Sequence, residues 1–88
     1  MENNRVIAEV ENIKTDLESA LKKTNELLDK VKGYDSFSKS NKSADIIFFL
    51  LESEEKNEEI DKKLYNALIR CRALTDILEN EVKLFKKD

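Results

Sequence analysis

Apolar residues recur along the first third of the chain with the spacing of a coiled-coil seam. The seam positions are separated alternately by four and three residues: Val6, Val10, Ile13, Leu17, Ala20, Thr24, Leu27 and Val31. This heptad pattern predicts one unbroken amphipathic helix over residues 3–32. Ile7, Leu21 and Leu28 widen the apolar stripe on one side. A stripe wider than a two-stranded seam indicates that this helix has more than one neighbour.

The next segment, residues 33–42, has the composition of a loop, GYDSFSKSNK. Gly33 follows two lysines, and cations before a residue that can take positive φ are typical of a helix C-terminus. The apolar residues of the loop are Tyr34 and Phe37. We expect them to fold back onto the end of the helices, with an exposed docking tip as the alternative.

Six consecutive apolar residues follow, Ile46, Ile47, Phe48, Phe49, Leu50 and Leu51. A strand is the rival reading, but no other segment alternates with a period of two, so the run is expected to be helical. Leaving each side chain in water would cost about 1.5–3 kcal/mol, so the run must be covered. It either plugs the core of the bundle or contacts another chain. The candidate partner-binding residues are therefore Ile46, Ile47, Phe48, Phe49, Leu50, Leu51, Tyr34 and Phe37.

An acidic run over residues 52–59 separates these six residues from a second apolar pattern. That pattern comprises Ile60, Leu64, Ala67, Leu68, Cys71, Leu74, Leu78, Val82 and Phe85. A single helix over 43–86 would be about 66 Å long, against about 45 Å for the first helix. We therefore expect a break, with helices over 43–52 and 57–86. The alternative is one straight helix whose excess length packs on a second copy.

The composition fits long helices with few connections. The chain of 88 residues has no Pro and one Gly, the two residues that supply most turns. This length corresponds to one domain, residues 1–88. The predicted fold is all-α, an antiparallel helical hairpin with a short middle helix.

The sequence carries no motif for catalysis or for a cofactor. It has no His and a single Cys, which closes the common zinc, iron–sulfur and haem sites. Cys71 occupies a seam position, so we expect it to be buried and inert rather than reactive. The acidic run lacks the alternating ligands and central Gly of a calcium loop. We expect no enzymatic activity, no metal, no cofactor and no small-molecule substrate.

Charge and hydropathy limit the remaining partners. The net charge of −3 argues against nucleic acid, because neutralising phosphates requires a basic surface. No apolar run approaches the roughly 18 residues of a membrane span. The start, MENNR, lacks the apolar region of a signal peptide. A cytoplasmic location is expected, and export without a cleaved signal stays open.

The layout of two long helices joined near the middle resembles the small helical hairpins of type VII secretion. These are the Trp-x-Gly family and its divergent relatives that accompany exported toxins. The turn Gly33-Tyr34-Asp35-Ser36 stands where that family has its Trp-x-Gly, and Leu84 and Asp88 have the spacing of its C-terminal export signal. The resemblance implies an antiparallel hairpin that dimerises or grips a helical partner.

Three classes of non-enzymatic function remain. The first is a secretion-associated or chaperone-like protein that covers an apolar helix of its partner. The second is a bacterial or phage regulator or inhibitor, such as an immunity protein, that binds one target. The third is a structural subunit that assembles with itself. Homodimer and heterodimer are both open at this point.

Overall fold

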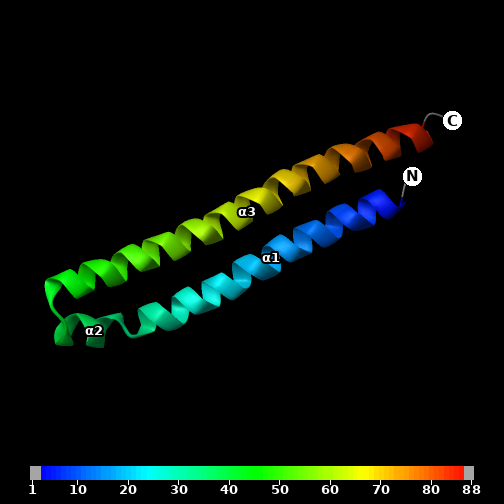
Figure 1. Cartoon of the computed structure of the whole chain (residues 1–88). Coiled ribbons are helices and arrows are strands. Elements are labelled where there is room, and N and C mark those ends of the chain that lie inside the picture. Colours follow the sequence, from blue (N-terminus) through cyan, green and yellow to red (C-terminus); the bar gives the residue numbers. More distant parts are fainter. Residues whose placement is uncertain (1–2, 87–88) are drawn as a thin grey trace.

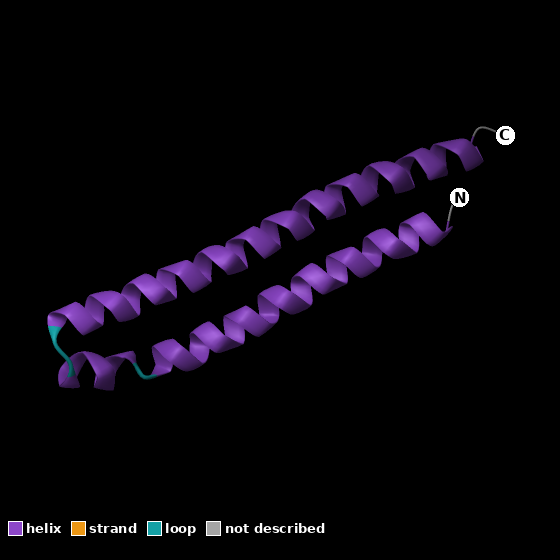
Figure 2. Cartoon of the chain, viewed as in Figure 1, coloured by secondary structure: helices purple, strands orange, loops and turns teal. Residues whose placement is uncertain are grey.

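The computed structural model of the protein describes residues 3–86, which form an all-helical hairpin (Figure 1). Its helices are α1 (Asn3–Lys32), α2 (Tyr34–Ser40) and α3 (Ser43–Lys86). The two long helices run antiparallel and side by side, and two short connections flank α2 at the closed end (Figure 2). The predicted all-α antiparallel hairpin with a short additional helix is confirmed. Asp88 of the export-like spacing lies outside the described residues.

The first helix has the predicted bounds, but the segment after it is not a loop. Gly33 has φ −89° and ψ −1°, an ordinary right-handed conformation rather than the expected positive φ. The chain therefore continues almost directly into α2, and the Phe37 amide donates to the Gly33 carbonyl at 3.0 Å. The short helix of the fold thus spans residues 34–40, whereas the sequence placed it at 43–52.

The predicted break in the last helix is wrong, because α3 is continuous over its 44 residues. The acidic run does not interrupt the helix, since its members pair with lysines of α1. Glu52 accepts from Lys30, and Glu59 accepts from Lys23 at 2.9 Å. The helical side facing α1 therefore continues through the acidic run.

The hairpin is long and thin. Its principal extents are 71 × 14 × 14 Å and its radius of gyration is 20.1 Å. A compact chain of this length would have a radius of gyration of about 12 Å. Since α3 is longer than α1, its C-terminal turns continue past the start of α1 (Figure 1). Within residues 3–86, no helical stretch combines the length and apolar character needed to cross a lipid bilayer.

The core between the helices is small. Among the described residues, the buried ones are Ala20, at 3% exposure, Ile60 at 8% and Ala67 at 3%. The accessible surface is 7077 Å². A compact monomer of this mass would have about 5,300 Å². Much apolar surface that a globular domain would bury is therefore left on the outside of the hairpin.

Candidate functional site

The side of each long helix that faces the other is defined by the residues that are shielded from solvent and follow heptad spacing, which leaves out the half-buried Ser19 and Glu59. On α1 they are Val6, Glu9, Ile13, Asp16, Ala20, Lys23, Leu27 and Lys30. On α3 they are Ile46, Phe49, Ser53, Lys56, Ile60, Lys63, Ala67, Arg70, Leu74, Ile77 and Glu81. Both sets alternate steps of three and four residues, so each forms a heptad seam. We call the two sets the inner seam.

Charged residues make up half of the inner seam on α1, and ion pairs tie them to α3. Lys23 pairs with Glu59 at 2.9 Å, and Lys30 pairs with Glu52. Arg70 Nε lies 3.2 Å from Asp16 Oδ2, and its guanidinium lies 3.9 Å from Glu9. The Asp16 oxygen is buried, so Arg70 supplies the charge that compensates its loss of water.

In one further pair, Lys56 of the inner seam lies 2.7 Å from Glu26, which is beside the seam on α1. The hydrogen bond from Lys56 lowers the pKa of Glu26 below its ordinary value, and the same bond raises the pKa of Lys56. The hydrogen bond from Lys23 likewise lowers the pKa of Glu59. These shifts favour the charged forms on both helices, so the pairs stabilise one alignment of the helices.

Three of the ion pairs give the alignment of the two helices along their length, and the two pairs of Arg70 fall on either side of it. Lys23 pairs with Glu59, Glu26 with Lys56 and Lys30 with Glu52, and the two residue numbers of each pair add to 82. Position i of α1 therefore lies level with position 82 − i of α3.

Aromatic side chains close the end of the hairpin where α2 lies. The ring of Phe49 stacks on Phe37 with centroids 4.9 Å apart, and Tyr34 lies at 5.6 Å with its ring tilted. The Lys30 ammonium lies 5.0 Å from the centroid of the Phe49 ring. The expectation that Tyr34 and Phe37 fold back onto the helix ends is confirmed.

A second heptad seam lies on the outside of each long helix, one residue after the inner seam. On α1 this outer seam is Ile7, Val10, Lys14, Leu17, Leu21, Thr24, Leu28 and Val31, all of them exposed. On α3 its apolar members are Ile47, Leu50, Leu64, Leu68, Cys71, Leu78, Val82 and Phe85, also exposed. The outer seam of α3 is polar only in its middle, at Glu54, Asn57 and Asp61, and at Thr75.

Both outer seams lie on the same side of the hairpin. One residue corresponds to a turn of about 100° around a right-handed helix. On each helix the outer seam is reached from the inner seam by that turn in the chain direction. Because the helices run antiparallel, equal turns from their facing sides end on the same side of the pair. The two outer seams therefore form one continuous surface, which we call the apolar face.

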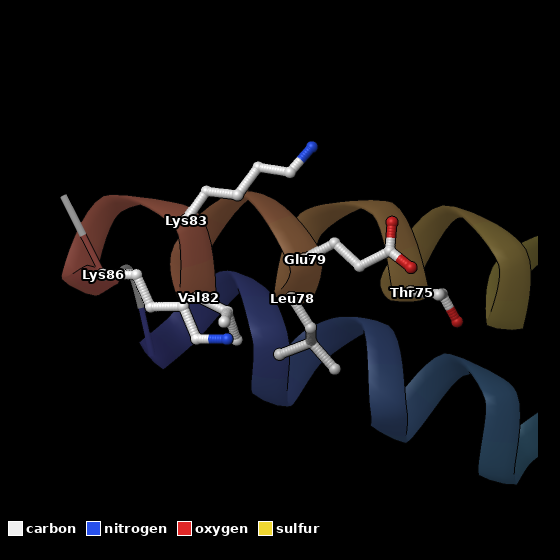
Figure 3. A pocket seen from close by; sticks show the side chains of 6 residues that line it. All are labelled: Thr75, Leu78, Glu79, Val82, Lys83 and Lys86. Carbon is white, nitrogen blue, oxygen red and sulfur yellow. The ribbon is translucent and has the colours of Figure 1, made fainter.

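Two shallow grooves are hollowed into the apolar face. One lies on α1 between Val10, Lys14, Leu17 and Leu21. The other lies on α3 between Thr75, Leu78, Glu79 and Val82 (Figure 3). Figure 3 shows Leu78 and Val82 projecting from the same side of α3, with the ammonium of Lys83 directed away from them. Such grooves can accept side chains of another helix, as in knobs-into-holes packing.

The structure divides the six-residue apolar run that the sequence singled out. Ile46 and Phe49 lie on the inner seam, so they pack within the hairpin. Ile47 and Leu50 lie on the apolar face. Leu51 flanks that face and is exposed, and Phe48, at 67% exposure, projects away from it. The run therefore combines both alternatives, with part of it plugging the closed end and part left open.

The candidate partner-binding residues named from the sequence do not include the C-terminal half of the apolar face, such as Leu64, Leu68 and Val82. The expectation that Cys71 is buried is wrong. Cys71 is exposed, because it follows the inner-seam residue Arg70 by one position. The available signal was the set of opposite charges, Arg70 against Asp16, that marks the true facing sides.

Comparison with known protein families, with curated proteins and with solved structures finds no match to this chain. Among the described residues, no group of Cys, Asp and Glu side chains is placed to hold a metal ion. The feature that stands out physically is the apolar face, which suits a protein partner.

Proposed function

We propose that the chain is a non-enzymatic module that binds a helical protein through its apolar face. One observation carries the proposal: the hairpin places charges between its own helices and leaves rows of leucines outside. Leu17, Leu21 and Leu28 on α1, with Leu64 and Leu68 on α3, are all more than two-fifths exposed. Large contiguous apolar surface is rare on soluble monomers and typically marks an interaction site.

The shape of the face favours a helical partner over a flat or extended one. The outer seams repeat with heptad spacing, and their grooves lie between residues three and four positions apart. Side chains of an amphipathic helix have the matching spacing. A secretion-associated or chaperone-like role, covering the apolar helix of another protein, is the setting that the layout of the hairpin suggests.

The proposal is tested by photo-cross-linking in a cell that expresses the chain. A photoreactive amino acid replaces Leu17 or Leu68 on the apolar face, and in matched controls it replaces Asn12 or Asn66 on the opposite side. We expect adducts with protein from the two positions on the face and few from the two controls. Equal yields from both sides, or no protein adducts from the face, would contradict the proposal.

A further inference from the structure

The outer seam of α1 reads alike from either end. Its steps from Ile7 to Val31 are three, four, three, four, three, four and three residues. The residue types mirror as well, because two β-branched residues lie at the ends and Leu17 and Leu21 lie in the middle. Lys14, before the centre of the seam, mirrors Thr24, after it. The steps of the inner seam of α1 are equally symmetric, so the mirrored residue types carry the argument. An apolar seam with this symmetry complements itself when two copies run antiparallel, as a two-fold dimer requires.

We propose that a second copy of this chain covers the apolar face. In this dimer α1 packs antiparallel on α1 of the second copy, and α3 packs antiparallel on α3 of the second copy. The result is a four-helix bundle in which every adjacent pair of helices is antiparallel. The inference rests on the proposed function and names the partner for the same face.

The palindrome sets the alignment of the two copies. Its centre lies at position 19, so position i of α1 lies level with position 38 − i of the second α1. Position 19 lies level with position 63 of α3, because facing positions of the hairpin add to 82. Position j of α3 is therefore level with position 126 − j of the second α3, so the alignment of α1 also sets the alignment of α3.

This alignment brings apolar side chains onto the two grooves. Leu21 of the second copy lies level with position 17, at the groove that Lys14, Leu17, Glu18 and Leu21 line on α1. Ile47 of the second copy lies level with position 79, between the Leu78 and Val82 that line the groove on α3 (Figure 3). The groove on α3 was not used to set the alignment, so the position of Ile47 at that groove supports the alignment.

The apolar seam of α1 favours this pairing over the other two-fold arrangement. In the proposed dimer Leu17 lies level with Leu21 of the second α1, so leucine meets leucine. A two-fold axis along the bundle would instead place α1 on the second α3, and Leu21 would then lie level with Asp61. The charges do not separate the two arrangements, because in the proposed dimer Leu68 lies level with Glu58 of the second copy.

The exposed surface is large enough for a stable dimer. The chain has roughly 1,800 Å² more accessible surface than a compact monomer of its mass. A specific interface of standard size buries about 800 Å² on each partner. The apolar face extends along most of the 71 Å length of the hairpin, so it can supply that area.

The test uses single cysteines on one flank of α1, in the full chain with Cys71→Ala. Two Glu18→Cys residues would be offset by about 3 Å along the bundle, since position 18 is level with position 20. Two Asn25→Cys residues would be offset by about 18 Å, and two Glu11→Cys residues by about 24 Å. With a short bifunctional maleimide, we expect Glu18→Cys to give a cross-linked dimer in high yield, and the other two variants at least fivefold less.

Mixing gives the complementary result. Position 11 lies level with position 27, so Glu11→Cys and Asn25→Cys together should cross-link efficiently although neither does alone. Light scattering should give the unmodified chain a mass near twice 10.2 kDa. Equal cross-linking of all three single variants, no cross-linking of Glu18→Cys, or a monomer at millimolar concentration would each overturn the proposal.

The two proposals fail in different ways. A monomeric chain whose photo-cross-links at Leu17 join it to another protein would overturn the dimer and leave the partner-binding function standing. A face that gives no adducts with any protein, itself included, would overturn both.

Discussion

Two adjacent phenylalanines give the most direct test of the fold. Phe49 and Phe48 are neighbours in α3, but Phe49 packs at the closed end and Phe48 is 67% exposed. Phe49→Ala and Phe48→Ala remove the same atoms and change helix propensity equally. Any difference between the two variants in the free energy of unfolding therefore reports the packing at the closed end.

The magnitude follows from the contacts of Phe49. It makes two aromatic contacts, with Phe37 and Tyr34, each worth about 0.5–1.5 kcal/mol. The Lys30 ammonium over the ring adds about 0.5–1 kcal/mol. Partial burial of the ring contributes about 1 kcal/mol more. We expect Phe49→Ala to cost about 2.5–5 kcal/mol and Phe48→Ala to stay within about 0.5 kcal/mol.

The measurement is urea unfolding followed by circular dichroism, with all proteins at the same concentration so that association contributes equally. The unfolding midpoint should fall clearly for Phe49→Ala, with the slope unchanged. Equal midpoints for the two variants, or a larger loss for Phe48→Ala, would refute the packing of α2 against α3.

Three further predictions concern local features. Gly33→Ala should stabilise the chain by about 0.4–1 kcal/mol in urea unfolding, because the native φ of −89° suits alanine and its Cβ would meet only the Lys30 carbonyl at 3.7 Å. In thermal melts across pH, the melting temperature should fall at acid pH, as Glu26 and Glu59, whose pKa values are lowered, become protonated. It should fall again at basic pH, as the pH passes the raised pKa of Lys56. A Glu26→Gln variant should show a smaller fall of the melting temperature at acid pH. Cys71→Ala should change the unfolding free energy by less than about 0.5 kcal/mol at concentrations where the chain is monomeric, because the thiol is exposed.

The existence and extent of the helices could be predicted from the sequence, whereas the continuity of α3 could not. Apolar spacing identified Asn3–Lys32 directly, because its seam is uninterrupted. In α3 the seam passes through Ser53 and Lys56, which a search for apolar periodicity reads as a gap. Their role becomes apparent only when α1 supplies Glu26 as the partner of Lys56. Pairwise complementarity between distant segments is information that a pattern along one segment does not contain.

For a related reason, the sequence did not show which seam of each helix faces the other helix. Val6, Ile13, Ala20 and Leu27 fit either a seam completed by Val10 and Leu17 or one completed by Glu9 and Asp16. Hydrophobicity alone favours the first set, and the sequence prediction accordingly turned that set inward. The structure turns the charged set inward, where Arg70 lies 3.2 Å from Asp16. The six-residue run indicated that the hairpin has more apolar surface than it can bury. It did not indicate where most of that surface lies.

The energetics of the two seams favour a hairpin whose apolar face is covered by a partner. Turning both long helices by about 100° would bury the leucines of the outer seams between them and move the ion pairs outside. Each fully buried leucine contributes about 1.5–3 kcal/mol, whereas ion pairs that water still reaches contribute little. The same turn would expose the apolar residues of the inner seams, but on α1 the outer seam has six apolar residues against four on the inner seam. A hairpin with no partner would therefore gain apolar burial from that turn. With the apolar face covered, the leucines are buried in either case, and the inward charges then add alignment without displacing apolar packing. The observed arrangement is therefore the favourable one for a chain whose apolar face is occupied.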